Sequence, residues 1–298
     1  MTTKTPPIKS QGIKTKLVPF IRDSIVWNDK IRWVEPFMGS GVVALNMQPK
    51  KALLADANPH LIGVYRDIQS GALTPASIRE HLQTHGDILN KNGEEYYYEV
   101  RKRFNEKPTS FDFLFLNRSC FNGVIRFNRK GHFNVPFCKK TERFRPAYIT
   151  KIANQVAWVQ KCLTTGDYEF VVQDWRKTLA DTSKSDFVYI DPPYIARHTD
   201  YYNSWADNDD HELAETVRSL PCGFAFSTWL QNKYRKNEYI EEHFAEFPMK
   251  TRSHFYHVGS HESLRNEMIE ALIIQNGYAK DSSNEDLRQH NLQAALPL

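Results

Sequence analysis

A short strand that leads directly into a glycine loop and then a helix is the feature that most restricts how this chain can fold. Residues 31–35 have strand character, the loop 36–41 follows, and the apolar run 42–47 favours the start of a helix. Gly39 and Gly41 remove side chains where a backbone must approach a ligand, and the helix start offers unpaired N–H groups. The loop therefore predicts a ligand site, with a purely structural turn as the alternative.

A second pair of strand and helix follows immediately. Residues 51–55 form an apolar strand that ends at Asp56, and residues 58–68 carry helical spacing of apolar side chains. The whole segment predicts a parallel βαβ unit. Because ligands bind at the carboxyl ends of strands in such sheets, the two oxygens of Asp56 would accept hydrogen bonds from a ribose diol.

Strand periodicity stops after this unit and resumes much later. The later strands are predicted at 168–172, 187–190 and 223–227, with a final pair at 252–258 and 270–275. Between them lie polar and aromatic helices and a hairpin-like stretch, 122–137, with its turn at 129–131. We predict an α/β fold with one discontinuous domain (1–70 and 164–280), an inserted, mainly helical subdomain that carries the β-hairpin (71–163), and a loosely ordered tail (281–298).

The composition is that of an ordinary globular protein. Hydrophobic residues make up 41% and charged residues 25% of the 298 positions, and no window approaches the roughly 20 apolar residues that a membrane span needs. The N-terminus has no apolar stretch of the signal-peptide type, so we expect a soluble, cytoplasmic protein without a membrane partner. The cysteines match neither a metal-ligand spacing nor a disulfide framework, and we expect all four to be reduced and mostly buried: Cys120, Cys138, Cys162 and Cys222.

Positive charge is concentrated in one segment. Residues 101–151 hold 13 Lys and Arg against three acids, a net of +10, whereas the whole chain carries only +4. Phenylalanines are interleaved with these cations, a mixture that suits phosphate neutralisation combined with stacking or packing. The segment is typical of a nucleic-acid-binding surface, and a solvated basic face over an aromatic core is the alternative.

The segment Asp191-Pro192-Pro193-Tyr194 directly follows a buried strand and is the most specific chemical motif. The exocyclic amine of adenine is a poor nucleophile, because its lone pair is delocalised into the ring. Two acceptors aimed at the amine hydrogens localise that lone pair, and Asp191 and the carbonyl of Pro192 can supply them on a rigid backbone. Tyr194 can stack on a base swung out of the duplex. The alternative is a Pro-Pro turn that caps the strand.

With these motifs in this order, the chain resembles the Dam-type DNA adenine-N6 methyltransferases, over most of its first 200 residues. The segments Glu35 to Gly41 and Leu54 to Asn58 resemble the family's methionine-binding loop and ribose-binding strand end. The resemblance implies S-adenosyl-L-methionine as cofactor on a Rossmann-like methyltransferase sheet. The residues that it places around the cofactor are Lys14, Phe37, Gly39, Gly41, Asp56 and Asp174.

Two of these assignments depend on shorter matches. Lys14 lies in 9–19, which resembles the family's N-terminal segment, in which a lysine reaches the active site; Ser10 and Ile13 depart from its usual aromatic and glycine. Asp174 lies in 172–175, which resembles the segment whose acid binds the cofactor's adenine amine. A plain turn residue is the alternative for Asp174.

The stretch from Leu116 to Phe137 resembles the family's recognition hairpin and implies a double-stranded DNA substrate. By that match Arg126 enters the major groove, where a guanidinium pairs well with guanine O6 and N7. A salt bridge at the edge of the core is the alternative for Arg126. The other residues that this stretch assigns to DNA are Asn122, Arg118, Arg129 and Lys130, the last three for phosphates or structure.

The resemblance weakens toward the C-terminus. Residues 201–205 and 207–211 predict a mobile acidic loop that closes over the flipped adenine. His254, His257 and His261 invite a metal interpretation by their spacing, but strand-like alternation and Gly259 disfavour it. We therefore predict no metal.

The motifs together predict a site-specific DNA adenine-N6 methyltransferase that flips adenine out of a short duplex sequence, with GATC favoured by the resemblance. DNA marking or restriction-modification is the expected role, with a cognate restriction endonuclease as the partner that the second role would imply and no obligatory protein partner otherwise. The rivals are an RNA amine methyltransferase and a non-catalytic DNA-binding module on the same fold. A-form RNA disfavours the first, because its major groove is deep and narrow.

Overall fold

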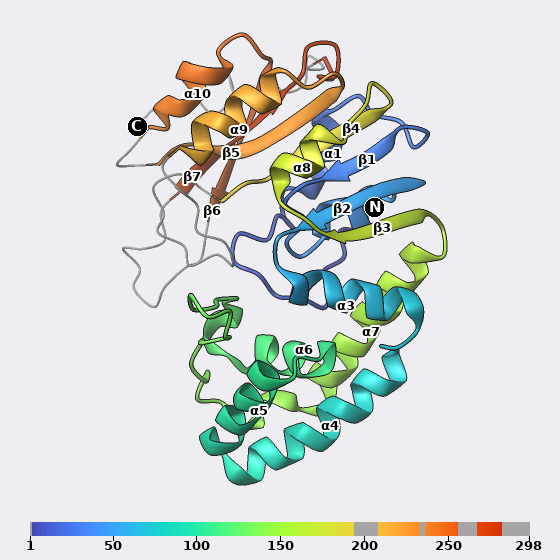
Figure 1. Cartoon of the computed structure of the whole chain (residues 1–298), viewed down its shortest axis with the longest axis vertical. Helices are drawn as coiled ribbons and strands as arrows, with labels where there is room; N and C mark the ends of the chain where they lie inside the picture. The colour runs from blue at the N-terminus through green and yellow to red at the C-terminus, as the bar shows by residue number, and fades with distance from the viewer. Residues whose placement is uncertain (1, 194–207, 233–235, 256–266, 282–298) are drawn as a thin grey trace, which may run out of the picture.

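The computed structural model describes residues 2–193, 208–232, 236–255 and 267–281 (Figure 1). Within these ranges the chain forms a seven-stranded sheet in the order β3-β2-β1-β4-β5-β7-β6. The strands are β1 (Arg32–Glu35), β2 (Lys51–Asp56), β3 (Asp167–Val172), β4 (Asp186–Ile190), β5 (Gly223–Asn232), β6 (Met249–Phe255) and β7 (Glu267–Ile274). Strands β1 to β5 pair in parallel, and β7 is antiparallel to both β5 and β6. The expected Rossmann-like α/β fold is confirmed.

Alternating side chains along each strand give the sheet two apolar faces. Trp33 and Phe187 point into one hydrophobic core, whereas their neighbours Val34 and Val188 point into another. The second core is closed by α8 (Trp175–Ala180), α9 (Asp209–Arg218) and α10 (Glu238–Phe244), which lie across one face of the sheet in Figure 1. The other face is covered by α1 (Val18–Ser24), α2 (Val42–Met47) and α3 (Pro59–Ser70).

The strand order reverses between β1 and β4. From β1 the chain builds outward to β2 and β3, and then returns to the other side of β1 with β4 and β5. Ligands of open α/β sheets bind outside the carboxyl ends of the strands at such a reversal. The fold therefore places the loop after β1 and the motif after β4 beside each other.

Each predicted strand has a counterpart in the described residues, with shifted ends; residues 256–258 of the strand predicted at 252–258 lie outside them. The largest shift is in β5, which continues to Asn232 instead of stopping at 227. Pairing with the antiparallel strand β7 supports this extension, through a register shift between Trp229 and Gln231. Of the acidic loop predicted over 201–205 and 207–211, residues 201–205 and 207 lie outside the described residues, and the last part of the prediction is wrong. Asp209 to His211 begin α9, because Leu213, Ala214 and Val217 bury a helical face against the sheet.

Four helices lie between α3 and β3 and form the lower half of the view in Figure 1. They are α4 (Pro75–Asn92), α5 (Glu94–Glu106), α6 (Ser110–Ser119) and α7 (Pro146–Leu163). Aromatic rings join them: Phe104 of α5 stacks on Phe113 of α6, and Phe115 of α6 stacks on Phe144. Much of the aromatic content of the basic segment is therefore core.

The stretch 122–137 is a hairpin held by isolated bridges instead of continuous strands. The bridges join Phe127 to Phe133 and Cys120 to Phe137. The turn falls where expected, because the Asn128 side chain accepts hydrogen bonds from the Lys130 and His132 N–H groups.

The cysteines and the hydropathy of the helices also bear on the predictions from composition. All four cysteines are free, as predicted; Cys120, Cys162 and Cys222 are buried, and Cys138 is half-buried. No helix in the described ranges is long and apolar enough to cross a membrane.

A half-buried histidine pair lies within the inserted helices. The rings of His81 and His85 are 4.1 Å apart, and Nε2 of His81 lies 3.6 Å from Oδ1 of Asp112. Asp112 is itself held by Arg103 through two hydrogen bonds of 2.6 and 2.9 Å. Burial first, and then the neighbouring His85, lowers the pKa of His81 to about 4, and burial lowers that of His85 as well.

Acid is therefore expected to destabilise the protein through His81. The unfolded chain takes up this proton near pH 6.5 and the folded chain only near pH 4, so stability is complete above pH 6.5 and falls between these values, by roughly 3 kcal/mol for this group. Urea unfolding at pH 7 and pH 4.5 measures the loss, and His81→Gln should flatten it. An unchanged pH dependence in that variant would show that the loss has another origin; His132→Ala, at an exposed position, is the control.

Candidate active site

Four acidic residues end the four strands on either side of the reversal point. Glu35 ends β1, Asp56 ends β2, Asp174 lies two residues beyond β3, and Asp191 directly follows β4. These strands are neighbours in the order β3-β2-β1-β4 and run parallel, so their carboxyl ends share one edge of the sheet. The fold thus brings together residues that are widely separated in the sequence.

Asp56 holds the glycine loop through both carboxylate oxygens. Oδ2 accepts the Gly39 N–H at 2.9 Å, and Oδ1 accepts the Asn58 N–H at 2.8 Å. Burial raises the pKa of Asp56, and these two N–H groups oppose that rise. A carboxylate has about four acceptor positions, so two remain for a ligand.

The loop itself is open on one side and packed on the other. Gly39 has φ of +51°, and a Cβ added there would meet no atom within 4 Å. Gly41 has φ of +66°, and its Cβ would lie 2.7 Å from Cε of Met38. The Tyr65 hydroxyl donates to the Ser40 carbonyl behind the loop. A ligand therefore has access to the backbone at Gly39, whereas Gly41 turns the chain into α2.

Glu35 is a buried acid to which the sequence analysis gave no separate role. Its side chain is 2% exposed, and Oε1 accepts a hydrogen bond from the Trp33 indole at 2.8 Å. Burial raises the pKa of Glu35 to about 8, although the bonds from Trp33 and from the Ala44 N–H oppose the rise. The carboxyl group is therefore mostly protonated at neutral pH. The sequence feature that could have singled out Glu35 is an acid at the end of an apolar strand.

Lys14 and Asp191 form the ion pair at the end of β4. Nζ of Lys14 lies 3.0 Å from Oδ1 of Asp191; the lysine side chain is 3% exposed and the aspartate side chain 22%. Burial raises the pKa of Asp191, Lys14 opposes that rise and Glu270 adds to it. Pro192 is buried directly after this pair. Tyr194 lies outside the described residues.

Further polar groups that the sequence analysis missed surround this pair. The Tyr189 hydroxyl is buried, its pKa is raised by burial and by Asp191, and its ring stacks on Trp33 with centroids 6.0 Å apart. Ser227 of β5 and Glu270 of β7 are also almost fully buried, at 3% and 1% exposure. Because buried polar groups are costly within a sheet, such a concentration makes this sheet edge the candidate active site.

Phe37 and Asp174 lie at the neighbouring strand ends. Phe37 is half-buried, and its ring is 6.3 Å from that of Trp175. Asp174 is 44% exposed and caps α8, because Oδ1 accepts the Arg176 N–H at 2.9 Å. Asp174 therefore has a local structural role, as the alternative prediction stated. The cap uses only Oδ1 of its carboxylate.

The hairpin presents a separate group of polar side chains. Asn122, Arg129 and Lys130 are exposed, and Asn122 adopts a left-handed φ of +52°. Arg126 is half-buried, and its Nε donates to Oδ1 of Asn134 at 2.7 Å across the hairpin. A second bond, from Nη2 to the Asn134 carbonyl at 3.3 Å, holds the guanidinium against the same residue.

The comparisons with known proteins agree with this arrangement. The sequence profile of a family described as D12 class N6 adenine-specific DNA methyltransferase matches residues 10–258, which include the crevice residues named above up to β5 and the whole hairpin. The chain belongs to this family. It is therefore an adenine-specific DNA methyltransferase, and the family resemblance predicted from the motifs is confirmed.

Several curated relatives of this D12 methyltransferase are DNA adenine methylases. One from Serratia marcescens is 31% identical over 223 residues, covering 72% of this chain and 77% of the relative. One from Vibrio cholerae serotype O1 is 33% identical over 209 residues, covering 67% and 71%. The retron Ec67 DNA adenine methylase of Escherichia coli is 30% identical over 218 residues, covering 70% and 71%.

One DNA assignment in the D12 methyltransferase needs correction. Arg118 is only 6% exposed; its Nε donates to the Pro7 carbonyl at 2.8 Å and its Nη2 to Oε1 of Gln155 at 2.6 Å. A guanidinium that is buried and bonded in this way cannot meet a phosphate. Of the two roles predicted for Arg118, the structural one is correct, because the residue joins the N-terminal segment to α6 and α7.

Arg118→Met is therefore expected to destabilise the fold by about 2–4 kcal/mol, since the Pro7 and Gln155 oxygens would stay buried without their donor. Urea unfolding measures this loss. Arg129→Ala is the matched control at an exposed position, with a change within about 0.5 kcal/mol. A stable Arg118 variant with weakened DNA binding would contradict the structural role.

Proposed function

We propose that this D12 methyltransferase transfers a methyl group from S-adenosyl-L-methionine to N6 of an adenine flipped out of a short duplex sequence. The observation that carries the proposal is the Lys14–Asp191 pair at the end of β4, at the same sheet edge as the glycine loop that Asp56 holds. Asp191 of the pair can accept a hydrogen bond from the target amine. The glycine loop with Asp56 suits a nucleoside. S-adenosyl-L-methionine provides the activated methyl group when bound.

The residues at the strand ends fit that cofactor. Gly39 leaves its backbone open, and Asp56 keeps two acceptor positions that suit a ribose diol. The second oxygen of Asp174 can accept an amine hydrogen, and Phe37 beside Trp175 offers an apolar wall. Gly41 allows the turn into α2, whose first N–H groups face the loop. Lys14 contacts Asp191, and in this proposal it lies between Asp191 and the cofactor.

Asp191 and the Pro192 carbonyl act on the target amine in this proposal. Each would accept a hydrogen bond from one amine hydrogen, so the nitrogen lone pair would be localised for in-line attack on the methyl group. The N6–CH3 bond would form as the sulfur–CH3 bond breaks, S-adenosylhomocysteine would leave, and the surplus N6 proton would pass to solvent. Pro192 and Pro193 limit the backbone freedom of the motif, and positioning of this kind contributes much of the acceleration. We assign Tyr194 to stacking on the flipped base.

The inserted unit 71–163 serves as the target-recognition domain in this proposal, and 1–70 with 164–280 as the catalytic one. Arg126 and Asn122 read base edges, and Arg129 and Lys130 at the turn neutralise phosphates. The relatives' names place them with DNA adenine methylation, and GATC is the site that we favour. A cytoplasmic role in DNA marking, with or without a cognate endonuclease, follows.

Lys14→Met tests the proposed chemistry through pH. Lys14 holds the pKa of Asp191 down, so its loss raises that pKa further, and the ionised carboxylate that methylation needs appears only at higher pH. The acid limb of the kcat profile should therefore move upward. Lys14→Arg, which keeps the charge, should shift it much less. Identical profiles for all three proteins would argue against an acceptor role of ionised Asp191.

Sequencing of N6-methyladenine positions in DNA from cells that express the protein tests the whole proposal. The expected result is modification at one short motif, with Asp191→Ala as the blank. Modification at a different motif would overturn only the GATC assignment. Absence of modified DNA, combined with methylated amines in RNA, would support the RNA rival, and absence of both would support the non-catalytic one.

A further inference from the structure

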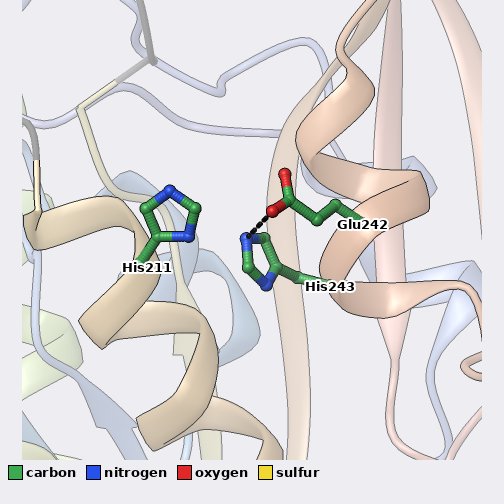
Figure 2. Close-up of side chains that lie close together, drawn as sticks. All are labelled: His211, Glu242 and His243. Atoms are coloured by element: carbon green, nitrogen blue, oxygen red, sulfur yellow. Dashed lines mark ion pairs between the residues drawn. The ribbon is translucent and has the colours of Figure 1, made fainter.

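A second cluster of chemically active side chains lies away from the crevice, between two helices that cover the sheet. Figure 2 shows His211 on α9 facing Glu242 and His243 on α10. One ligand atom from each of these three residues lies within 4.8 Å of the other two. One imidazole from α9 thus lies close to an imidazole and a carboxylate from α10.

The helices hold this cluster in a defined geometry. The Tyr239 hydroxyl of α10 donates to the Asp210 carbonyl of α9 at 2.7 Å, one residue before His211. The ring of His243 lies 4.8 Å from that of Tyr239 and 4.8 Å from that of His211. Below these contacts the same helices share an apolar core, to which α9 contributes Leu213, Ala214 and Val217 and α10 contributes Ile240 and Phe244. The two backbones that present the ligands are therefore fixed.

His243 carries an unsatisfied nitrogen inside this cluster. Its side chain is 12% exposed, and Nε2 is buried without a hydrogen-bond partner. The nearest acid oxygen, Oε1 of Glu242, is 3.7 Å away, which is too far for a hydrogen bond. A buried polar atom without a partner needs an explanation, and a ligand that binds it is one of the few.

We propose that His211, Glu242 and His243 form a Zn²⁺ site that joins α9 to α10. Imidazole and carboxylate are the donors that Zn²⁺ accepts, and three protein ligands leave a fourth position for water. Ligand atoms about 2.0–2.2 Å from a tetrahedral ion are about 3.4 Å apart, so the cluster must contract slightly. Glu242 is 60% exposed and His211 is exposed, so both side chains can rotate to do this. The ion would link two helices that pack on the sheet, and its fourth position would stay open, as in other zinc sites with three protein ligands.

Zinc titration of the tag-free, chelator-treated chain against a chromophoric competitor tests the site. We expect one ion per chain, and a melting temperature that rises with zinc. His211→Ala and Glu242→Gln should each weaken zinc binding by at least the 10–100-fold that loss of an outer-shell partner costs at other sites. Both positions are exposed, so these variants should fold even where His243→Ala does not. His132→Ala, on the exposed hairpin turn, is the matched control and should bind as the parent does.

Cobalt supplies the second measurement. Co²⁺ in the parent chain should give the intense visible absorption of a four-coordinate ion, and Glu242→Gln should reduce it. Unchanged zinc affinity in the His211 and Glu242 variants would overturn the proposal. So would the loss of all zinc binding in a His254→Ala, His257→Ala, His261→Ala variant with these two residues intact, because the ion would then belong to a different histidine group.

Discussion

Asp191→Ala is expected to abolish transfer of a tritiated methyl group to DNA, with a loss of about 10²–10³-fold or more. In the proposed geometry the Asp191 carboxylate is one of the two groups that accept hydrogen bonds from the target amine, and this variant removes it. The Lys14 ammonium, which is 3% exposed, also loses its partner at 3.0 Å. Cofactor binding should persist, because Asp56 and the glycine loop are held independently through the bond from Gly39.

Asp191→Asn separates the chemical loss from a structural one. The amide has nearly the same volume and keeps one acceptor oxygen, so the fold should be retained while methyl transfer remains far below the parent rate. Binding of S-adenosylhomocysteine by calorimetry and the melting temperature are the controls for both variants. Full activity in either folded variant would refute the role assigned to Asp191.

Asp56→Asn is expected to weaken S-adenosyl-L-methionine binding by about 100-fold, a larger effect than its small change in shape suggests. Both carboxylate oxygens accept backbone N–H groups, from Gly39 at 2.9 Å and Asn58 at 2.8 Å. An amide has only one acceptor oxygen, so in either orientation its NH₂ group faces a backbone donor. Hydrogen bonds to charged groups contribute about 1.5–3 kcal/mol each, which corresponds to the predicted loss.

Calorimetric titration with S-adenosylhomocysteine measures the loss for Asp56→Asn. The matched control is Asp174→Asn, because Asp174 is 44% exposed and its Oδ1 alone caps α8, so one amide oxygen can replace it there. That variant should lose less affinity than Asp56→Asn. Equal losses would show that loop support by Asp56 is not the dominant contribution, and unchanged affinity for Asp56→Asn would remove Asp56 from the cofactor site.

Features that depend on neighbours in the chain were predictable from the sequence. The strand-loop-helix unit, the acid at 56 and the acid at 191 all depend on short apolar runs in the sequence, and the predicted strands and helix form at these runs. The hairpin turn at Arg129 and Lys130 was predictable for the same reason, because Asn128 and Gly131 fold it locally. The family followed from the order of these local motifs.

Features that depend on burial were decided only by the tertiary structure. Arg118 and Arg129 look equally basic in the sequence, yet Arg118 bonds to Pro7, 111 positions earlier, and to Gln155, 37 positions later. The pKa of Glu35 rises to about 8 only because the fold removes it from water.

The Lys14–Asp191 ion pair and the cluster on α9 and α10 differ in the same way in what the sequence could show. The resemblance predicted that Lys14 reaches the active site, and Nζ of Lys14 lies 3.0 Å from Oδ1 of Asp191. The sequence could not show the His211, Glu242 and His243 cluster, whose members come from two helices. Local propensity depends on a few adjacent residues, whereas pairing, burial and pKa depend on atoms that only the packed sheet and its helices bring together.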